Sequence, residues 1–204
     1  MRPFLFALSI LALTTIAAPA RAQTEHYKFD TVHSQIIFYV NHLGFSTSEG
    51  EFLDFDGSLE FNHDDPAASK VDVTIDTNSL SMDDETWNEH LKGKNFFDVA
   101  QFPKMTFKST SIKVTGEKTA DITGDLTLLG VTKSVTLKTV YNKSGNHPFT
   151  GKYISGFSAT TSVKRSDFGM NYGLPGIGDD VEIRIEVEAI RADDTDKETS
   201  SDKE

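Results

Sequence analysis

Apolar and polar residues alternate with a period of two along most of this chain, and this pattern constrains its fold more than any other feature. It is clearest in residues 181–189, where Val181, Ile183, Ile185 and Val187 alternate with charged residues. Successive side chains of a β-strand point to opposite faces, so a period of two gives a strand one apolar face. We count eight to ten such strands. The expected inward-facing sets are Ile36, Phe38 and Val40; Leu59 and Phe61; Val71, Val73 and Ile75; Met105 and Phe107; Ile112 and Val114; Ile122, Leu126 and Leu128; Val135 and Leu137; and Phe157, Ala159 and Val163.

Short segments of turn-forming residues separate these strands, which favours antiparallel neighbours. They include Asp56-Gly57, residues 115–118 (TGEK) and residues 144–146 (SGN). One segment departs from the pattern. Residues 81–92 begin with a Ser-x-x-Asp cap, place Trp87, His90 and Leu91 on one helical face and stop before Gly93, so they predict a short helix.

Strands with one apolar face can stack as a sandwich or close into a barrel. The chain has no cysteine, so the Cys-Trp-Cys support of an immunoglobulin-like sandwich is missing. Closure removes exposed edge strands, and a single helix suits a cap over a barrel mouth. The sequence therefore favours an all-β barrel with a short helical insert. Without disulfides, this fold must be held together by one large packed core.

Both ends of the chain differ from this body. Arg2 precedes an apolar run, and Ala20-Arg21-Ala22 resembles a signal-peptidase site, so residues 1–22 predict a secretory signal peptide cleaved after Ala22. Residues 23–191 are expected to form the barrel domain. The last stretch, 192–204, is rich in acids and lacks large apolar residues, which predicts a disordered acidic tail.

Composition excludes several functions. With 20 Lys and Arg against 31 Asp and Glu, the net charge of −11 makes nucleic-acid binding improbable. The absence of cysteine excludes thiol catalysis, iron–sulfur clusters and cysteine-based zinc sites. The six histidines are scattered, with His33, His42, His63, His90 and His147 in different elements, and no Ser/His/Asp triad or carboxylate pair is recognisable. We therefore expect no metal ligands, no catalytic residues and no enzyme activity.

Two polar residues lie an even number of positions from the apolar residues of their strands, so they are expected to face inward with them. His42 continues the set of Ile36, Phe38 and Val40, and Arg165 continues that of Phe157, Ala159 and Val163. Arg165 would form an internal ion pair near Asp167 or act as a fixed donor to the polar head of a ligand. Phenylalanines are abundant on the apolar faces, and they either fill the barrel or surround one small ligand.

Taken together, four ordered motifs resemble the YceI-like family of secreted, lipocalin-like proteins that bind polyisoprenoids. They are residues 29–34 (FDTVHS) with 38–44 (FYVNHLG); 76–79 (DTNS) with 90–92, 96–98 and 102–107 (FPKMTF); 124–133 (GDLTLLGVTK); and 164–169 (KRSDFG). Leu129 and Ser134 depart from the family pattern, since many members carry His and Pro there.

The resemblance implies an extended eight-stranded antiparallel barrel with a helical cap and a tunnel for an isoprenoid tail. Its implied function is a periplasmic carrier or sequestering protein for a polyisoprenoid, isoprenoid quinone or related lipid. No cofactor would be required beyond such a bound lipid. The expected ligand-binding residues, assigned by parity, are Phe38, Val40, His42, Phe45, Leu91, Phe96, Phe97, Phe107, Leu126, Leu128, Arg165 and Phe168.

Two other functions stay open at this stage. One is a periplasmic hydrolase or redox partner that uses His42 or His90 near the barrel mouth. The other is a stress or interaction module whose core is filled by its own side chains and has no internal void. The sequence also leaves a homodimer open, and it contains no span after the leader apolar enough to cross a membrane.

Overall fold

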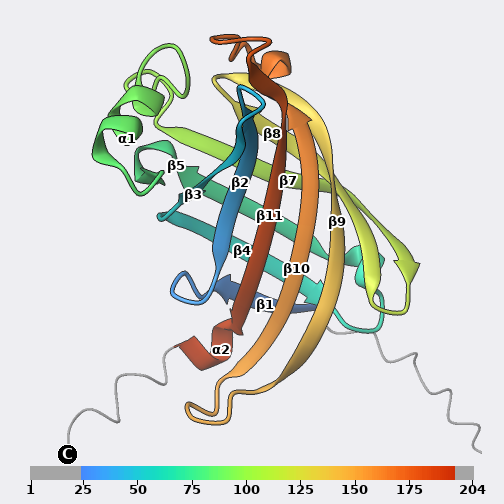
Figure 1. The fold of residues 1–204 in the computed structure, drawn as a ribbon. Helices are drawn as coiled ribbons and strands as arrows, with labels where there is room; N and C mark the ends of the chain where they lie inside the picture. The colour runs from blue at the N-terminus through green and yellow to red at the C-terminus, as the bar shows by residue number, and fades with distance from the viewer. Residues whose placement is uncertain (1–23, 196–204) are drawn as a thin grey trace, which may run out of the picture.

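The computed structural model describes residues 24–195, which form a β-barrel with one helix at its upper end (Figure 1). The predicted signal peptide and its cleavage site lie outside the described residues, as does the tail beyond residue 195. No helix in the described part is long and apolar enough to cross a membrane.

Eleven strand segments make up the sheet. They are β1 (Thr24–Phe29), β2 (Gln35–His42), β3 (Ser46–Phe52), β4 (Phe55–Asn62), β5 (Lys70–Asp76), β6 (Leu80–Ser81), β7 (Lys104–Gly116), β8 (Thr119–Leu128), β9 (Val131–Asn146), β10 (Tyr153–Lys164) and β11 (Ile177–Arg191). Three short 3-10 helices, η1 (Pro66–Ala68), η2 (Thr77–Ser79) and η3 (Arg165–Phe168), lie in the connections.

The sheet closes on itself through eight strands. The hydrogen-bonded order β1-β4-β5-β7-β8-β9-β10-β11 returns to its start because β11 also pairs with β1, and all of these pairings are antiparallel. The predicted eight-stranded antiparallel barrel is therefore confirmed. A second branch, β2-β3-β6, continues from the other half of β11.

Both β1 and β2 pair with the long strand β11, and the irregular segment 30–34 lies between them. β1 pairs with residues 189–191 of β11, whereas β2 pairs with residues 177–186. In this segment, the buried Ser34 replaces missing ladder bonds. Its hydroxyl donates to the Glu188 carbonyl at 3.3 Å and accepts from the Glu188 N–H at 3.0 Å. These two bonds pair the backbone of Glu188 where the ladder between β11 and its neighbours is interrupted.

The helix α1 (Glu85–Lys92) ends before Gly93 as predicted, but it begins later than expected. Asp84 is its N-cap and accepts from the Trp87 N–H at 2.8 Å, while Ser81 belongs to β6. Asp83 has a positive φ of 57° and breaks the helical path between them. The prediction of a cap at Ser81 is therefore wrong, because Asp84, three positions later, supplies the cap.

A second short helix, α2 (Ala192–Thr195), occupies the first residues of the segment expected to be disordered. Asp194 is 2% exposed, accepts from the Tyr153 N–H at 3.1 Å and pairs with Arg191 at 3.2 Å. The disorder prediction is therefore wrong for this turn, because an acid in a polar segment finds partners at the end of the barrel.

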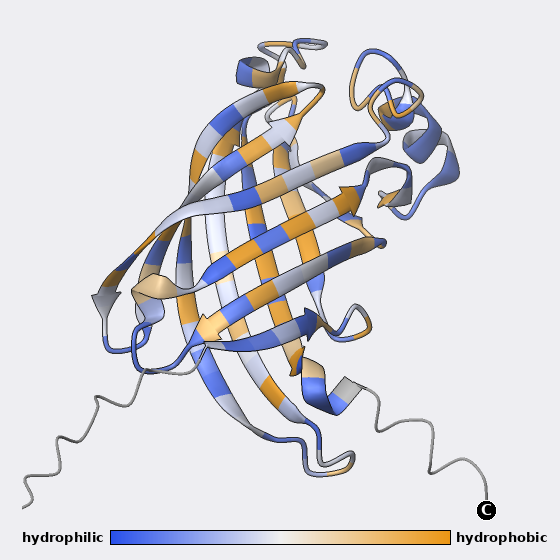
Figure 2. Ribbon diagram, turned by 180° about the vertical axis from the view of Figure 1, so that it is seen from behind, coloured by the Kyte–Doolittle hydropathy of each residue, from blue (hydrophilic) through white to orange (hydrophobic). Residues whose placement is uncertain are grey.

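Apolar residues alternate with polar ones along the strands, as Figure 2 shows by colour. The inward set forms one large core cluster, with a smaller cluster around Tyr27, Leu59, Phe61 and Ala189. Two predicted turns are wrong: Asp56 and Gly57 lie inside β4, and residues 144–146 form the end of β9, where they pair with β10.

Candidate functional site

The barrel interior contains two apolar cavities. The larger has a volume of about 310 Å³ and lies among side chains of β4, β5 and β7 to β11, including Phe55, Phe107 and Phe157. The smaller, of about 200 Å³, lies under α1 and the segment that follows it, between Phe38, Leu91 and Phe97. These cavities agree with the expected hollow barrel and not with the alternative of a core filled by its own side chains.

Four residues line both cavities and so lie between them: Ile36, Met105, Leu126 and Ile183. They come from two pairs of neighbouring strands, β7 with β8 and β11 with β2. We call these four residues the waist. An elongated ligand that occupied both cavities would pass through it.

Three aromatic rings lie directly against glycines on neighbouring strands. Phe38 pairs with Gly50 across β2 and β3, and a Cβ at Gly50 would lie 2.5 Å from Phe38 Cζ. A Cβ at Gly124 would likewise lie 2.5 Å from Phe107 Cζ, and Phe29 packs on Gly57 in the same way. Each glycine lets a large ring lie close to the barrel wall, which leaves space in the interior.

The substitution Gly50→Ala tests this role. Its methyl group would collide with Phe38 and Met82, which both line the smaller cavity and would be pushed into it. We expect the free energy of unfolding to fall by about 1–3 kcal/mol. We also expect fluorescence of an apolar dye bound in the interior to decrease.

Gly145→Ala is the matched control, since the nearest atom to a Cβ there is Lys143 Cε at 3.7 Å. Denaturant unfolding and dye titration of both variants give the comparison. Equal results for the two substitutions would contradict the role of Gly50.

At the α1 end of the barrel, aromatic and imidazole rings surround the mouth of the smaller cavity. The half-buried His42 lies with its ring centroid 6.0 Å from that of Trp87. His90 lies 5.1 Å from Phe96 and 6.0 Å from Tyr172, measured in the same way. Within residues 24–195, neither His42 nor His90 has a hydrogen-bonded side-chain partner that would make it a catalytic base.

Arg165 lies beside the smaller cavity, but its donors are directed at the backbone. Nε donates to the Gly178 carbonyl at 2.7 Å, Nη1 to that of Met170 at 2.8 Å and Nη2 to that of Ile177 at 3.1 Å. Burial lowers the pKa of this guanidinium, and the Asp179 carboxylate opposes the shift.

The expected ion pair of Arg165 near Asp167 is therefore wrong, because Asp167 is exposed and backbone carbonyls take its place. The alternative, a donor aimed at a ligand head, is also not what the structure shows. All three side-chain nitrogens of Arg165 hold the segment 170–178 against the barrel.

Most of the residues assigned by parity line a cavity. The smaller cavity brings together nine of them: Phe38, Val40, His42, Leu91, Phe96, Phe97, Leu126, Leu128 and Arg165. Phe107 lines the larger cavity, together with Leu126.

Two of the assigned residues, Phe45 and Phe168, line neither cavity. Phe45 is 90% exposed, because the turn at Leu43 and Gly44, both with positive φ, breaks the alternation that continues from β2. Phe168 is buried in the core cluster without lining either cavity, because it belongs to η3 rather than to a strand.

The assignment missed much of the larger cavity. Its unassigned lining residues include Phe29, Phe55, Phe61, Tyr141 and Phe157. The signal was present for Phe61 and Phe157, which belong to the alternating sets. A polar network reaches this cavity through His63, which lines it and whose Nε2 lies 3.3 Å from the Tyr27 hydroxyl. That hydroxyl donates to Glu25 at 2.5 Å, and Arg191 pairs with Glu25 at 3.1 Å. Burial raises the pKa of Tyr27, as does its bond to Glu25.

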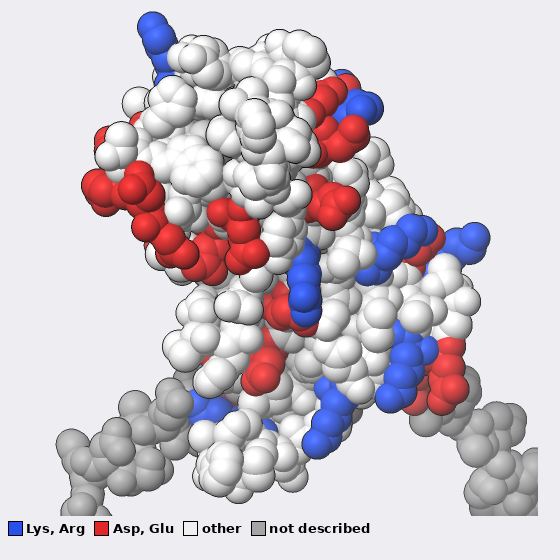
Figure 3. All heavy atoms as spheres, viewed as in Figure 1, with Lys and Arg blue, Asp and Glu red and all other residues white. Residues whose placement is uncertain are grey.

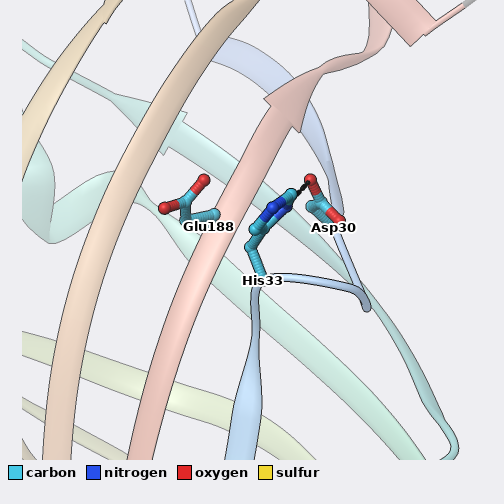
Figure 4. A group of neighbouring side chains, drawn as sticks. All are labelled: Asp30, His33 and Glu188. Atoms are coloured by element: carbon cyan, nitrogen blue, oxygen red, sulfur yellow. Dashed lines mark hydrogen bonds and ion pairs between the residues drawn. The ribbon is translucent and has the colours of Figure 1, made fainter. Parts of the chain in front are cut away.

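A second cluster of polar side chains lies on the outside of the barrel, at the connection between β1 and β2. Asp30, His33 and Glu188 place one potential ligand atom each within 4.8 Å of the others (Figure 4). Asp30 also accepts from the Val32 N–H at 3.0 Å and lies 2.9 Å from His33 Nδ1. These bonds give the group a role in the turn, and His33 is largely exposed.

The pair Asp30–His33 predicts a pH dependence of stability. Its hydrogen bond to Asp30 raises the pKa of His33 above the ordinary 6.5. For Asp30, burial acts to raise the pKa, but the bonds from His33 and Val32 outweigh it and lower the pKa below 3.8. The contribution of His33 to the free energy of unfolding is complete below pH 6.5 and is lost as the pH rises through the folded-state pKa of His33. The contribution of Asp30 is lost as the pH falls through the folded-state pKa of Asp30.

His33→Gln is therefore expected to lower the Tm at pH 5 more than at pH 8.5. Thermal unfolding followed by circular dichroism at both values measures this difference. An equal change in Tm at the two pH values would show that the imidazolium does not contribute.

The fold and its two apolar cavities define a class: a hollow, lipocalin-like β-barrel with an interior suited to one apolar ligand. The model of the YceI-like domain matches residues 27–189. The chain belongs to the YceI-like family.

Relatives and solved structures agree with this assignment. A UPF0312 protein of Pseudomonas paraeruginosa is 41% identical over 187 residues, covering 90% of this chain and 97% of the relative. The crystal structure of Burkholderia cenocepacia BcnA has a TM-score of 0.72 at 25% identity and covers 78% of this chain and 98% of its own. A polyisoprenoid binding domain from Saccharophagus degradans has a TM-score of 0.64 at 14% identity, with coverage of 83% and 99%.

Proposed function

We propose that this protein binds one long apolar chain, an isoprenoid or an isoprenoid quinone, in the interior of the barrel. The observation that supports this most strongly is the pair of apolar cavities that adjoin at the waist. An interior lined almost entirely by aliphatic and aromatic side chains selects for an apolar ligand, because polar groups placed there would lose their hydrogen bonds to water.

The energetics favour a chain of several isoprene units. Burial of one five-carbon unit stabilises a complex by about 3–4 kcal/mol before ordering costs, at about 0.8 kcal/mol for each carbon. Several units therefore outweigh the losses of association without strong polar contacts. The selectivity of the protein would then depend on the length and width of its interior.

His42 is the residue that we assign to the polar end of the ligand. It faces the smaller cavity near the mouth, and its imidazole can donate a hydrogen bond to a quinone carbonyl. Arg165 contributes by holding the neighbouring segment in place.

We also propose that the protein acts as a periplasmic carrier or sequestering protein rather than as an enzyme. The signal-peptide pattern of residues 1–22 supports this location. The shared fold with a structure described as a polyisoprenoid binding domain is in keeping with a binding role.

The test is to produce the chain with its own leader in a Gram-negative host and to purify it without detergent. Native mass spectrometry and solvent extraction should then yield an isoprenoid lipid at up to one molecule per chain. Protein stripped of lipid should bind geranylgeraniol. An empty native protein that also fails to take up isoprenoid chains would contradict the proposal.

A further inference from the structure

Four large apolar side chains are exposed together around the mouth of the smaller cavity. Leu43 is 54% exposed, Phe45 90%, Trp87 36% and Tyr172 49%. They come from the β2–β3 turn, from α1 and from the segment 169–176, which lie at the same end of the barrel (Figure 1). We call these four residues the collar.

Contacts between these three segments make the collar one surface. The Leu43 N–H donates to the Gly176 carbonyl at 3.0 Å, which joins the β2–β3 turn to the segment of Tyr172. Trp87 packs on His42, and Tyr172 packs on His90 and on Phe96. His42, Trp87, His90 and Phe96 also line the smaller cavity, so the collar is continuous with the interior.

The residue types of the collar suit the boundary between water and lipid. Trp and Tyr combine an apolar ring with a polar tip and favour the level of the lipid head groups, while Phe and Leu can enter the acyl region. An isoprenoid chain is itself dissolved in a bilayer, so a mouth that rests on lipid avoids passing the chain through water.

We propose that the collar docks this protein onto the surface of a zwitterionic bilayer, with the mouth of the smaller cavity facing the lipid. This inference rests on the proposed function, since it concerns how the apolar ligand enters and leaves. Docking would be peripheral and reversible, because only a few side chains would enter the lipid.

Charge favours zwitterionic over anionic lipid. Exposed acids on and before α1, namely Asp83, Asp84, Glu85 and Glu89, flank Trp87. Figure 3 shows acidic side chains gathered over the α1 side of the molecule. Like charges would repel an anionic surface, and salt would screen this repulsion.

Co-sedimentation with phosphatidylcholine vesicles tests the proposal. We expect wild-type protein to partition onto them and Phe45→Ser to partition about tenfold less, as the loss of one buried phenyl ring predicts. The matched control is Phe149→Ser, which removes a ring that is 91% exposed on the β9–β10 turn and should leave partitioning unchanged. Vesicles containing phosphatidylglycerol should bind the wild type less well at low salt than at high salt.

A second readout separates docking from ligand binding. Phe45→Ser should keep the wild-type affinity for geranylgeraniol added from solvent, and it should slow transfer of the chain from vesicles. Equal partitioning of the two Phe variants would overturn the docking inference, as would wild-type self-association through the collar with no binding to vesicles. A wild type that binds no isoprenoid from solvent would instead overturn the proposed function.

Discussion

Replacing Leu126 by Trp is expected to weaken the binding of long isoprenoid chains strongly while leaving the barrel folded. Leu126 lies at the waist and lines both cavities, so an indole there would close the path between them. Each isoprene unit excluded from the interior removes about 3–4 kcal/mol of apolar burial. The affinity for chains that need both cavities should therefore fall at least about 100-fold.

The control for this substitution is Thr127→Trp on the adjacent position of β8. Thr127 faces outward, where its hydroxyl lies 2.8 Å from that of Thr132. Isothermal titration with farnesol and with longer isoprenols compares the variants, and the shortest chains should still bind to Leu126→Trp. Unchanged affinity for long chains would show that the ligand does not pass the waist.

The second large effect is expected from Arg165→Met. Loss of the guanidinium leaves the carbonyls of Met170, Ile177 and Gly178, which are buried or partly buried, without their charged donor. Breaking such a buried charged network costs about 3–5 kcal/mol. For a domain of this size, that corresponds to a decrease in Tm of roughly 10 °C.

Arg184→Met is the control, because Arg184 is exposed and pairs with the nearby Glu186. Differential scanning calorimetry gives the two changes in Tm. The affinity of Arg165→Met for geranylgeraniol, measured well below its Tm, should stay within a few-fold of the wild type. A large loss of affinity with an unchanged Tm would mean that Arg165 serves the ligand directly.

Alternation along the chain predicts the strands and much of the apolar interior, because a period of two is a local property of each strand. It fails where the local path changes. Phe45 follows a turn with two positive φ values, and Phe168 lies in a 3-10 helix, so neither keeps the parity of its strand. The helix α1 was predicted at its C-terminal end, where Gly93 stops it, and not at its start.

Features that depend on pairs of distant residues could not be predicted. Gly57 looks like part of a turn in the sequence, yet it lies within β4 and makes room for Phe29. Asp30 and His33 lie close to Glu188 only because β11 passes beside the irregular segment that joins β1 to β2. The cavities depend on such pairings between strands, and no single segment encodes their volume.

The most direct test of this account is the affinity of stripped wild-type protein for a series of isoprenols of increasing length. We expect the affinity to rise with each added isoprene unit and to level off once the chain fills both cavities. Affinity that is weak at every length, or that does not depend on length, would contradict a barrel whose interior holds an apolar chain.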